Sequence, residues 1–504
     1  MGPTVTFAAQ VSGSALPATG LSYSSAPGRW VLAASVLGSG IATLDATVVG
    51  IALPSIGRDF HVGVGALQWV VTGYTLTLAA FLLLGGSLGD RYGRRRVFAV
   101  GVASFALASA ACGLAPDAAA LIAARLVQGV GGALLTPASL AMLEASFAPA
   151  DRSRAIGAWS GLGGLATATG PLVGGYLISA LSWRAVFFIN LPLSAVVLAV
   201  TARHVPESRD PAAAGRIDVP GAVLATVLLS GLTFALIEGP SSGWTSPLVL
   251  AGIIAAPAAG AALIAVDRRK ANPMLPVGLF AVRQFSAANA VTFFVYGALG
   301  GALFLLPVEL QVVKRYSALA SGVALLPVTA IMLAFSARSG RLAARLGPRA
   351  QMSIGPVVAG VGLALLARAT HPGSYAAVVL PAIACFGAGL AITVAPLTTT
   401  AMEAAPPERA GAASAVNNVV ARAAGLLAVA VLPVAIGLTG DEALRAATLA
   451  PAFQAAVLGS GAMCALGGLL AAITITNPMR PPDVARSAGR WHCALAAPPA
   501  RGPA

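Results

Sequence analysis

The sequence predicts an all-α integral membrane protein with fourteen transmembrane helices. Of its 504 residues, 57% are hydrophobic and only 10% are charged, and the mean hydropathy is +0.85. A helix needs about 20 apolar residues to cross roughly 30 Å of hydrocarbon, and fourteen stretches of the chain are long and apolar enough. These stretches lie at about 30–54, 67–89, 97–115, 118–141, 155–179, 185–202, 219–238, 247–266, 285–308, 320–339, 351–369, 375–399, 410–437 and 453–475.

An arginine-rich turn that occurs twice predicts two related halves. The turn at Gly86–Arg96 lies between the second and third expected helices and contains Asp90 among four arginines. Its spacing recurs about 254 residues later, in a turn that lies between the tenth and eleventh helices. The recurring positions are Gly340, Leu342, Arg345, Gly347 and Arg349. Repeats of this kind are typical of secondary transporters.

The repeat distance leaves room for two extra helices between the halves. The expected organisation is an N-terminal tail (1–29), a six-helix half (30–202), a linker with two transmembrane helices (203–284), a second six-helix half (285–475) and a C-terminal tail (476–504).

The distribution of basic residues predicts the orientation. Most of the 31 lysines and arginines fall in connections that follow even-numbered helices. Because lysine and arginine accumulate on the cytoplasmic side, both tails are expected in the cytoplasm of a multi-pass cell-membrane protein. Spread over short loops, these residues also account for the net charge of +14 without a nucleic-acid partner. Arginines outnumber lysines 29 to two, as in the GC-rich, actinobacterial type of bacterial genome.

The sequence gives no sign of a metal site or a cofactor. No pair among its four cysteines has metal-ligand spacing, and no phosphate-binding loop is present. ATP hydrolysis by this chain is therefore not expected. A membrane-embedded enzyme or sensor would need a catalytic constellation or a soluble domain, and the sequence shows neither. The expected partners are the lipid bilayer, protons and a hydrophobic small molecule, and the chain is expected to be a monomer.

Two opposite charges are expected at similar depth in the membrane. Asp45 lies about nine residues from the outer end of the first helix, and Arg125 about seven from that of the fourth. At 1.5 Å per residue both lie roughly 10–14 Å deep, so they are predicted to pair. Desolvation favours a neutral carboxyl group and arginine favours a charged one, and a carboxylate between these influences suits proton transfer. A purely structural buried ion pair is the alternative.

Four further residues are candidates for the interior. Glu309 lies near the outer end of the ninth helix and is either a third proton-coupling residue or a structural one. Arg422 lies near the middle of the thirteenth helix and needs a polar partner. With Arg422, Tyr74 and Gln128 are expected to line a cavity, although a packing role for Tyr74 is equally compatible with the sequence.

Several motifs resemble signatures of the major facilitator superfamily. The Gly86–Arg96 turn resembles the cytoplasmic signature of that family, and Arg125–Gly132 resembles its second motif. Leu44–Pro54 and Trp183–Pro192 resemble motifs of its fourteen-helix drug:proton antiporter branch. The chain has Gly50 where that branch usually has asparagine. In the second turn, Ala344 aligns with Asp90.

The resemblance implies a cytoplasmic gate in the first turn. Glycines permit a tight turn and close helix approach. Asp90 is expected to pair with a cationic group or to accept hydrogen bonds from a neighbouring helix N-terminus, and so to hold the halves together. A plain positive anchor in the membrane interface is the alternative. The gate residues are Gly86, Asp90, Arg91, Gly93 and Arg94.

A glycine-rich stretch of the fifth helix resembles the antiporter motif, which is found mainly in exporters. Its residues are Gly170, Pro171, Gly174 and Gly175, and small residues allow a tight contact with the opposite half. The expected function is proton-coupled export of drugs or antibiotics by alternating access. The first alternative is an uptake symporter of the same fold. A membrane sensor or enzyme is the less favoured second alternative.

Overall fold

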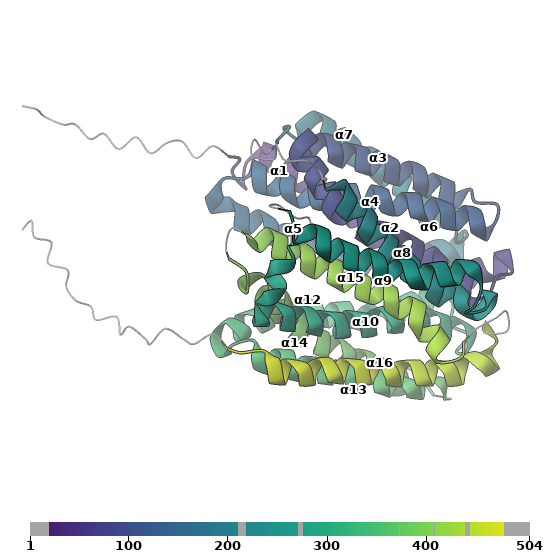
Figure 1. Cartoon of the computed structure of the whole chain (residues 1–504). Coiled ribbons are helices and arrows are strands. Elements are labelled where there is room, and N and C mark those ends of the chain that lie inside the picture. The colour runs from purple at the N-terminus through teal and green to yellow at the C-terminus, as the bar shows by residue number, and fades with distance from the viewer. Residues whose placement is uncertain are drawn as a thin grey trace, which may run out of the picture.

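Long helices that run side by side form almost all of the protein (Figure 1). The computed structural model describes residues 20–209, 218–270, 276–371, 373–406, 409–438 and 444–477. Within these ranges no strand is present. Most of the two expected tails, and parts of the expected linker, lie outside the described residues.

The N-terminal half begins with five long helices. Its sixth expected helix is divided at Ile189 into a short segment and a longer one. The helices are α1 (Ala26–Phe60), α2 (Val64–Tyr92), α3 (Arg94–Gly113), α4 (Ala118–Ser146), α5 (Pro149–Ala180), α6 (Ala185–Phe188) and α7 (Asn190–His204).

The inserted pair and the C-terminal half follow. The expected tenth helix is divided at Leu325, and the twelfth begins with a π-helical turn. The elements are α8 (Val219–Ser242), α9 (Pro247–Asp267), η1 (Val277–Ala281), α10 (Arg283–Val312), α11 (Ala318–Ala324), α12 (Leu326–Leu346), α13 (Arg349–Leu366), η2 (Ala367–Thr370), η3 (Tyr375–Val379), α14 (Leu380–Glu403), α15 (Ala410–Ala435) and α16 (Ala446–Thr474).

Each of the fourteen expected spans is helical. Thirteen of the described helices are long and apolar enough to cross a membrane. The remaining one, α5, has 32 residues, but its many glycines and threonines make it less apolar. The inserted helix α8 packs against α9, α2 of the first half and α15 of the second.

Hydrogen bonds join the two halves at one end of the bundle. Gln68 Nε2 donates to the Val429 carbonyl at 2.6 Å, and Gln311 Nε2 to the Ile51 carbonyl at 2.9 Å. At the end of α5, Ser179 Oγ accepts from the Leu319 amide at 3.4 Å. We call this the closed end. The opposite end, where Gly93 and Gly347 connect consecutive helices, is the turn end.

Helix α5 shows how the separation of the halves changes along the bundle. Toward the closed end, a Cβ on Gly175 would lie 2.7 Å from the Ala318 carbonyl oxygen of the opposite half. Toward the turn end, Gly157 and Gly161 face open space, with no atom within 4 Å of such a Cβ. The structure is therefore closed at one end and more open along α5 toward the other.

Candidate functional site

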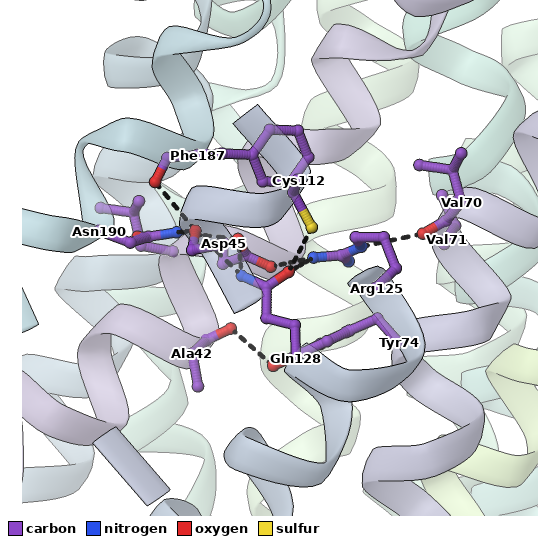
Figure 2. A network of polar contacts seen from close by, with 12 residues as sticks. Ala42, Asp45, Val70, Val71, Tyr74, Cys112, Arg125, Gln128, Phe187 and Asn190 are labelled. Atoms are coloured by element: carbon purple, nitrogen blue, oxygen red, sulfur yellow. Dashed lines mark hydrogen bonds and ion pairs between the residues drawn. The ribbon is translucent and has the colours of Figure 1, made fainter. Parts of the chain in front are cut away.

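Asp45 and Arg125 form a buried ion pair in the N-terminal half (Figure 2). Arg125 Nη1 lies 2.5 Å from Asp45 Oδ2, and both side chains are at most 1% exposed. Arg125 Nε also donates to the Val70 carbonyl at 3.0 Å. The structure thus brings together the two charges whose similar depth predicted a pair, and it seals them from solvent.

Two amides complete the surroundings of the Asp45 carboxylate. Gln128 Nε2 and Asn190 Nδ2 donate to Asp45 Oδ1 at 2.9 and 3.0 Å. Gln128 Oε1 accepts from Arg125 Nη1 at 2.6 Å. Ser109 Oγ, which donates to the Phe187 carbonyl, lies 3.0 Å from Asn190 Nδ2. Asp45 thus accepts three hydrogen bonds, one of them from the arginine with which it forms the ion pair.

Tyr74 and Gln128, which we expected to line a cavity with packing as the alternative for Tyr74, belong to this network. The Tyr74 ring centroid lies 4.3 Å from the Arg125 guanidinium carbon, within cation–π range. Tyr74 is 2% exposed and Gln128 is fully buried. Both side chains are thus packed inside the N-terminal half in this conformation, and their lining of a cavity stays a prediction.

Glu309 lies apart from this network. It is on α10 in the other half, is fully buried, and neither carboxylate oxygen has a hydrogen-bond partner among the described residues. An ionised carboxylate without donors is very costly in such surroundings. Glu309 is therefore a second candidate for proton binding that is distinct from Asp45.

Arg422 lies on α15. We expected a polar partner for its guanidinium, and the structure shows none for one of its nitrogens among the described residues. Its Nε is buried and has no hydrogen-bond partner within the described structure. The phenols of Tyr74 and Tyr296 interact with it electrostatically.

In the arginine-rich turn, Asp90 pairs with an arginine of its own half. Asp90 Oδ1 near the end of α2 accepts from Nε and Nη2 of Arg94, the first residue of α3, at 2.9 and 2.8 Å. Our expectation that Asp90 bridges the halves is therefore not met in this conformation, in which α5 faces open space toward the turn end. Gly93 has φ of 112°, and its neighbour Arg95 donates its amide to Glu207 Oε1 at 3.1 Å.

The second turn is built in the same way. Gly347 also has a positive φ, of 87°. The following Arg349 donates its amide to Asn477 Oδ1 at 3.0 Å. In each half, a residue that follows the last helix thus binds the start of the helix after the turn: Glu207 in the first half and Asn477 in the second.

Gly93→Ala is expected to destabilise the protein. A Cβ at this position would require a strained φ, which costs about 1–3 kcal/mol, and would lie 2.7 Å from the Glu207 carboxylate. The matched control is Gly89→Ala in the same turn, where the nearest atom is 4.0 Å away. Thermal unfolding in detergent should show a lower midpoint for the first variant only. Equal midpoints would contradict this account of the turn.

The glycine motif of α5 makes close contacts on two sides. A Cβ on Gly174 would lie 2.6 Å from Val48 Cγ1 of α1, and one on Gly170 would collide with Thr47. On the other side, Gly175 faces the backbone of α11, where a Cβ on Gly322 would in turn collide with Pro171. The motif thus packs α5 tightly on its own half and on the opposite half, as small residues permit.

Trp183 and Arg184 anchor the closed end. Arg184 Nη1 lies 2.6 Å from Asp59 Oδ2, and Trp183 Nε1 donates to the same oxygen at 3.0 Å. The sequence identified this motif only by its resemblance to the fourteen-helix branch and did not predict that its Asn190 reaches Asp45. It also missed Ser109 and Glu207, because a single serine or glutamate carries no pattern that predicts its partner.

Known proteins are similar to this chain in sequence. Residues 35–429 match the Major Facilitator Superfamily. Multidrug resistance protein Stp of Mycobacterium tuberculosis is 39% identical over 388 residues, which cover 77% of this chain and 72% of Stp. Methylenomycin A resistance protein of Streptomyces coelicolor is 37% identical over 445 residues, covering 87% and 91%.

Solved structures agree in fold. A D-xylose-proton symporter has a TM-score of 0.64 with 15% identity, covering 89% of this chain and 98% of its own. A POT family transporter has a TM-score of 0.66 with 11% identity, covering 87% and 94%. The chain therefore belongs to the major facilitator superfamily, as the resemblance of its motifs implied, and is a multi-pass membrane protein.

Proposed function

We propose that the protein exports hydrophobic small molecules, such as drugs or antibiotics, across the cell membrane in exchange for protons. The relatives support export, since they carry names such as multidrug resistance protein and methylenomycin A resistance protein. The observation that carries the proposal is the seal between α5 and α11, where Gly175 lies against the Ala318–Leu319 backbone. This motif is typical of exporters, and a tight seal prevents leakage during exchange.

In this proposal the turn end faces the cytoplasm. The basic residues Arg91, Arg94, Arg95 and Arg96 gather there, as the positive-inside rule requires. The described conformation is then closed to the outside and more open to the inside. A substrate would enter from the cytoplasm or the inner leaflet, between α5 and the helices of the opposite half.

The proton gradient supplies the driving force, and Asp45 is the residue that takes up and releases the proton. In the conformation described here, Asp45 is sealed and held by Arg125, Gln128 and Asn190. When the halves rock apart at the closed end, protonation from outside would weaken the ion pair and favour release of the substrate. Each inward proton contributes about 2.3 kcal/mol per 100 mV of membrane potential.

Uptake symport is the second candidate, and the fold permits it, since the D-xylose-proton symporter shares that fold. At 15% identity that likeness shows the fold alone. The α5 motif and the named resistance relatives both favour export.

Drug efflux from cells tests the proposal. Cells that make the protein are loaded with a panel of lipophilic cations, anions and neutral antibiotics, and the loss of each compound is followed with and without a protonophore. We expect protonophore-sensitive efflux of at least one compound. Efflux that the protonophore leaves unchanged would contradict proton coupling, and inward accumulation would favour the symporter.

Glu309→Gln is expected to lower proton-driven export about tenfold or more. Glutamine keeps the shape of this buried side chain but cannot take up a proton, and the variant should be at least as thermally stable as the native protein because no charge needs burial. Export is measured in inside-out vesicles with an imposed pH gradient.

Glu238→Gln is the matched control, because Glu238 lies near the closed end of α8 and accepts from Trp69 Nε1 at 2.7 Å. We expect near-native export from it. If Glu309→Gln exports at the rate of the native protein, Glu309 does not take part in proton coupling.

A further inference from the structure

Arg422 is a partly buried cation on α15, and no ion pair identified among the described residues neutralises it. Near mid-membrane, Arg125 is matched by Asp45, and Glu309 lies toward the closed end of α10. None of the ion pairs identified among the described residues includes Arg422, and its Nε is buried and unpartnered. Intramembrane charges are costly, and they are usually retained where they bind an ion or a substrate.

Helix α15 directs Arg422 toward the N-terminal half. Residues three or four apart share one face of a helix. On this face, Val419 packs against a cluster of N-terminal side chains, and Ala423 and Leu426 pack with residues of α2 and α8. Arg422 lies between Val419 and Leu426 on the same face.

The surroundings of Arg422 are apolar and aromatic. Helix α15, which carries it, packs against α2 and α10, and Tyr74 of α2 and Tyr296 of α10 interact with Arg422 electrostatically. The Tyr74 hydroxyl donates to the Ala42 carbonyl at 3.3 Å. Neither tyrosine supplies a negative charge, so the guanidinium keeps its capacity to bind an anion.

We propose that Arg422 binds an acidic group of the exported substrate, so that the preferred substrates are hydrophobic organic anions such as carboxylates or acidic phenols. A planar guanidinium forms paired hydrogen bonds to a carboxylate, and neighbouring apolar side chains accommodate a hydrophobic body. The inference rests on the proposed export function and defines its substrate class. A membrane potential that is negative inside also favours the outward movement of an anion.

Two dyes with the same ring system and opposite charge test the inference. Carboxyfluorescein is an anion and rhodamine methyl ester is a cation, and both contain a xanthene. Transport of each is measured in inside-out vesicles for the native protein, Arg422→Gln and Arg422→Lys. The control is Arg409→Gln, which removes the same charge from the exposed residue that precedes α15.

We expect the native protein and the Arg409 variant to transport the anion at least tenfold faster than the cation. Arg422→Gln should lose this preference through slower transport of the anion, and Arg422→Lys should keep part of it. If Arg422→Gln fails to insert in the membrane, the preference of the native protein for the anionic or the cationic dye still tests the inference.

A native protein that prefers the cation, or an Arg422→Gln variant that keeps native preference, would overturn the inference and leave the proposed export intact. Transport of neither dye and of no other panel compound would contradict the export function itself.

Discussion

Asp45→Asn is expected to abolish proton-driven export while the protein still inserts in the membrane. Asparagine keeps the size of the side chain and can still meet Gln128 and Asn190, but it cannot cycle between charged and neutral forms. The variant leaves Arg125 without its counter-charge, and breaking a buried pair costs about 3–5 kcal/mol. Contacts of Arg125 with the Val70 carbonyl and the Tyr74 ring offset part of that loss.

A double variant separates proton coupling from a structural ion pair. Asp45→Asn combined with Arg125→Gln removes both charges and therefore the unpaired cation. If the pair is only structural, this variant should regain both stability and export. We expect it to regain thermal stability but not proton-driven export.

The control for both variants is Asp59→Asn, at the closed end of the same helix. Asp59 is exposed at the closed end and pairs with Arg184, and exposed ion pairs contribute little. Its export should be near native. Full proton-driven export by Asp45→Asn would exclude Asp45 from the mechanism.

Gly175→Val is expected to prevent closure of the bundle between α5 and α11. Its first side-chain carbon would lie 2.7 Å from the Leu319 Cα and the Ala318 carbonyl oxygen, both of them backbone atoms. Overpacking costs about 1–3 kcal/mol. Because this cost applies only when the closed end is shut, it shifts the equilibrium roughly 5- to 150-fold toward the outward-open state.

A cysteine at Ser321 reports this shift. Ser321 is fully buried on α11, so Ser321→Cys should react slowly with an impermeant thiol reagent added outside. We expect Gly175→Val to accelerate that reaction at least fivefold and to lower export.

Gly161→Val is the matched control, on the same helix but facing open space. It should leave the labelling rate unchanged. Equal labelling of the two valine variants would show that Gly175 does not form the seal.

Much of the architecture follows from the sequence. Apolar length located the fourteen helices because the bilayer imposes that length on any spanning helix. The pairing of Asp45 with Arg125 followed from their similar depth. The repeated turns followed from the spacing of glycine and arginine, and both turn glycines do have positive φ values.

Contacts that depend on helix rotation and on the conformation of the halves did not follow from the sequence. The inward direction of Tyr74 and Gln128 depends on how closely α2 and α4 pack. Asn190, which donates to Asp45, is the first residue of α7, and the sequence did not predict that the sixth span is divided at Ile189. Asp90 pairs with Arg94 in this conformation, and the sequence alone does not say which state the halves adopt.

Transport by the purified protein in liposomes tests the central claim most directly. With the turn end outside, an imposed gradient that is acidic inside should drive the substrate into the liposomes while protons leave, and Asp45→Asn should abolish both movements. Export by proton exchange predicts that substrate and protons move in opposite directions. Movement of both in the same direction, or substrate movement that ignores the gradient, would contradict it.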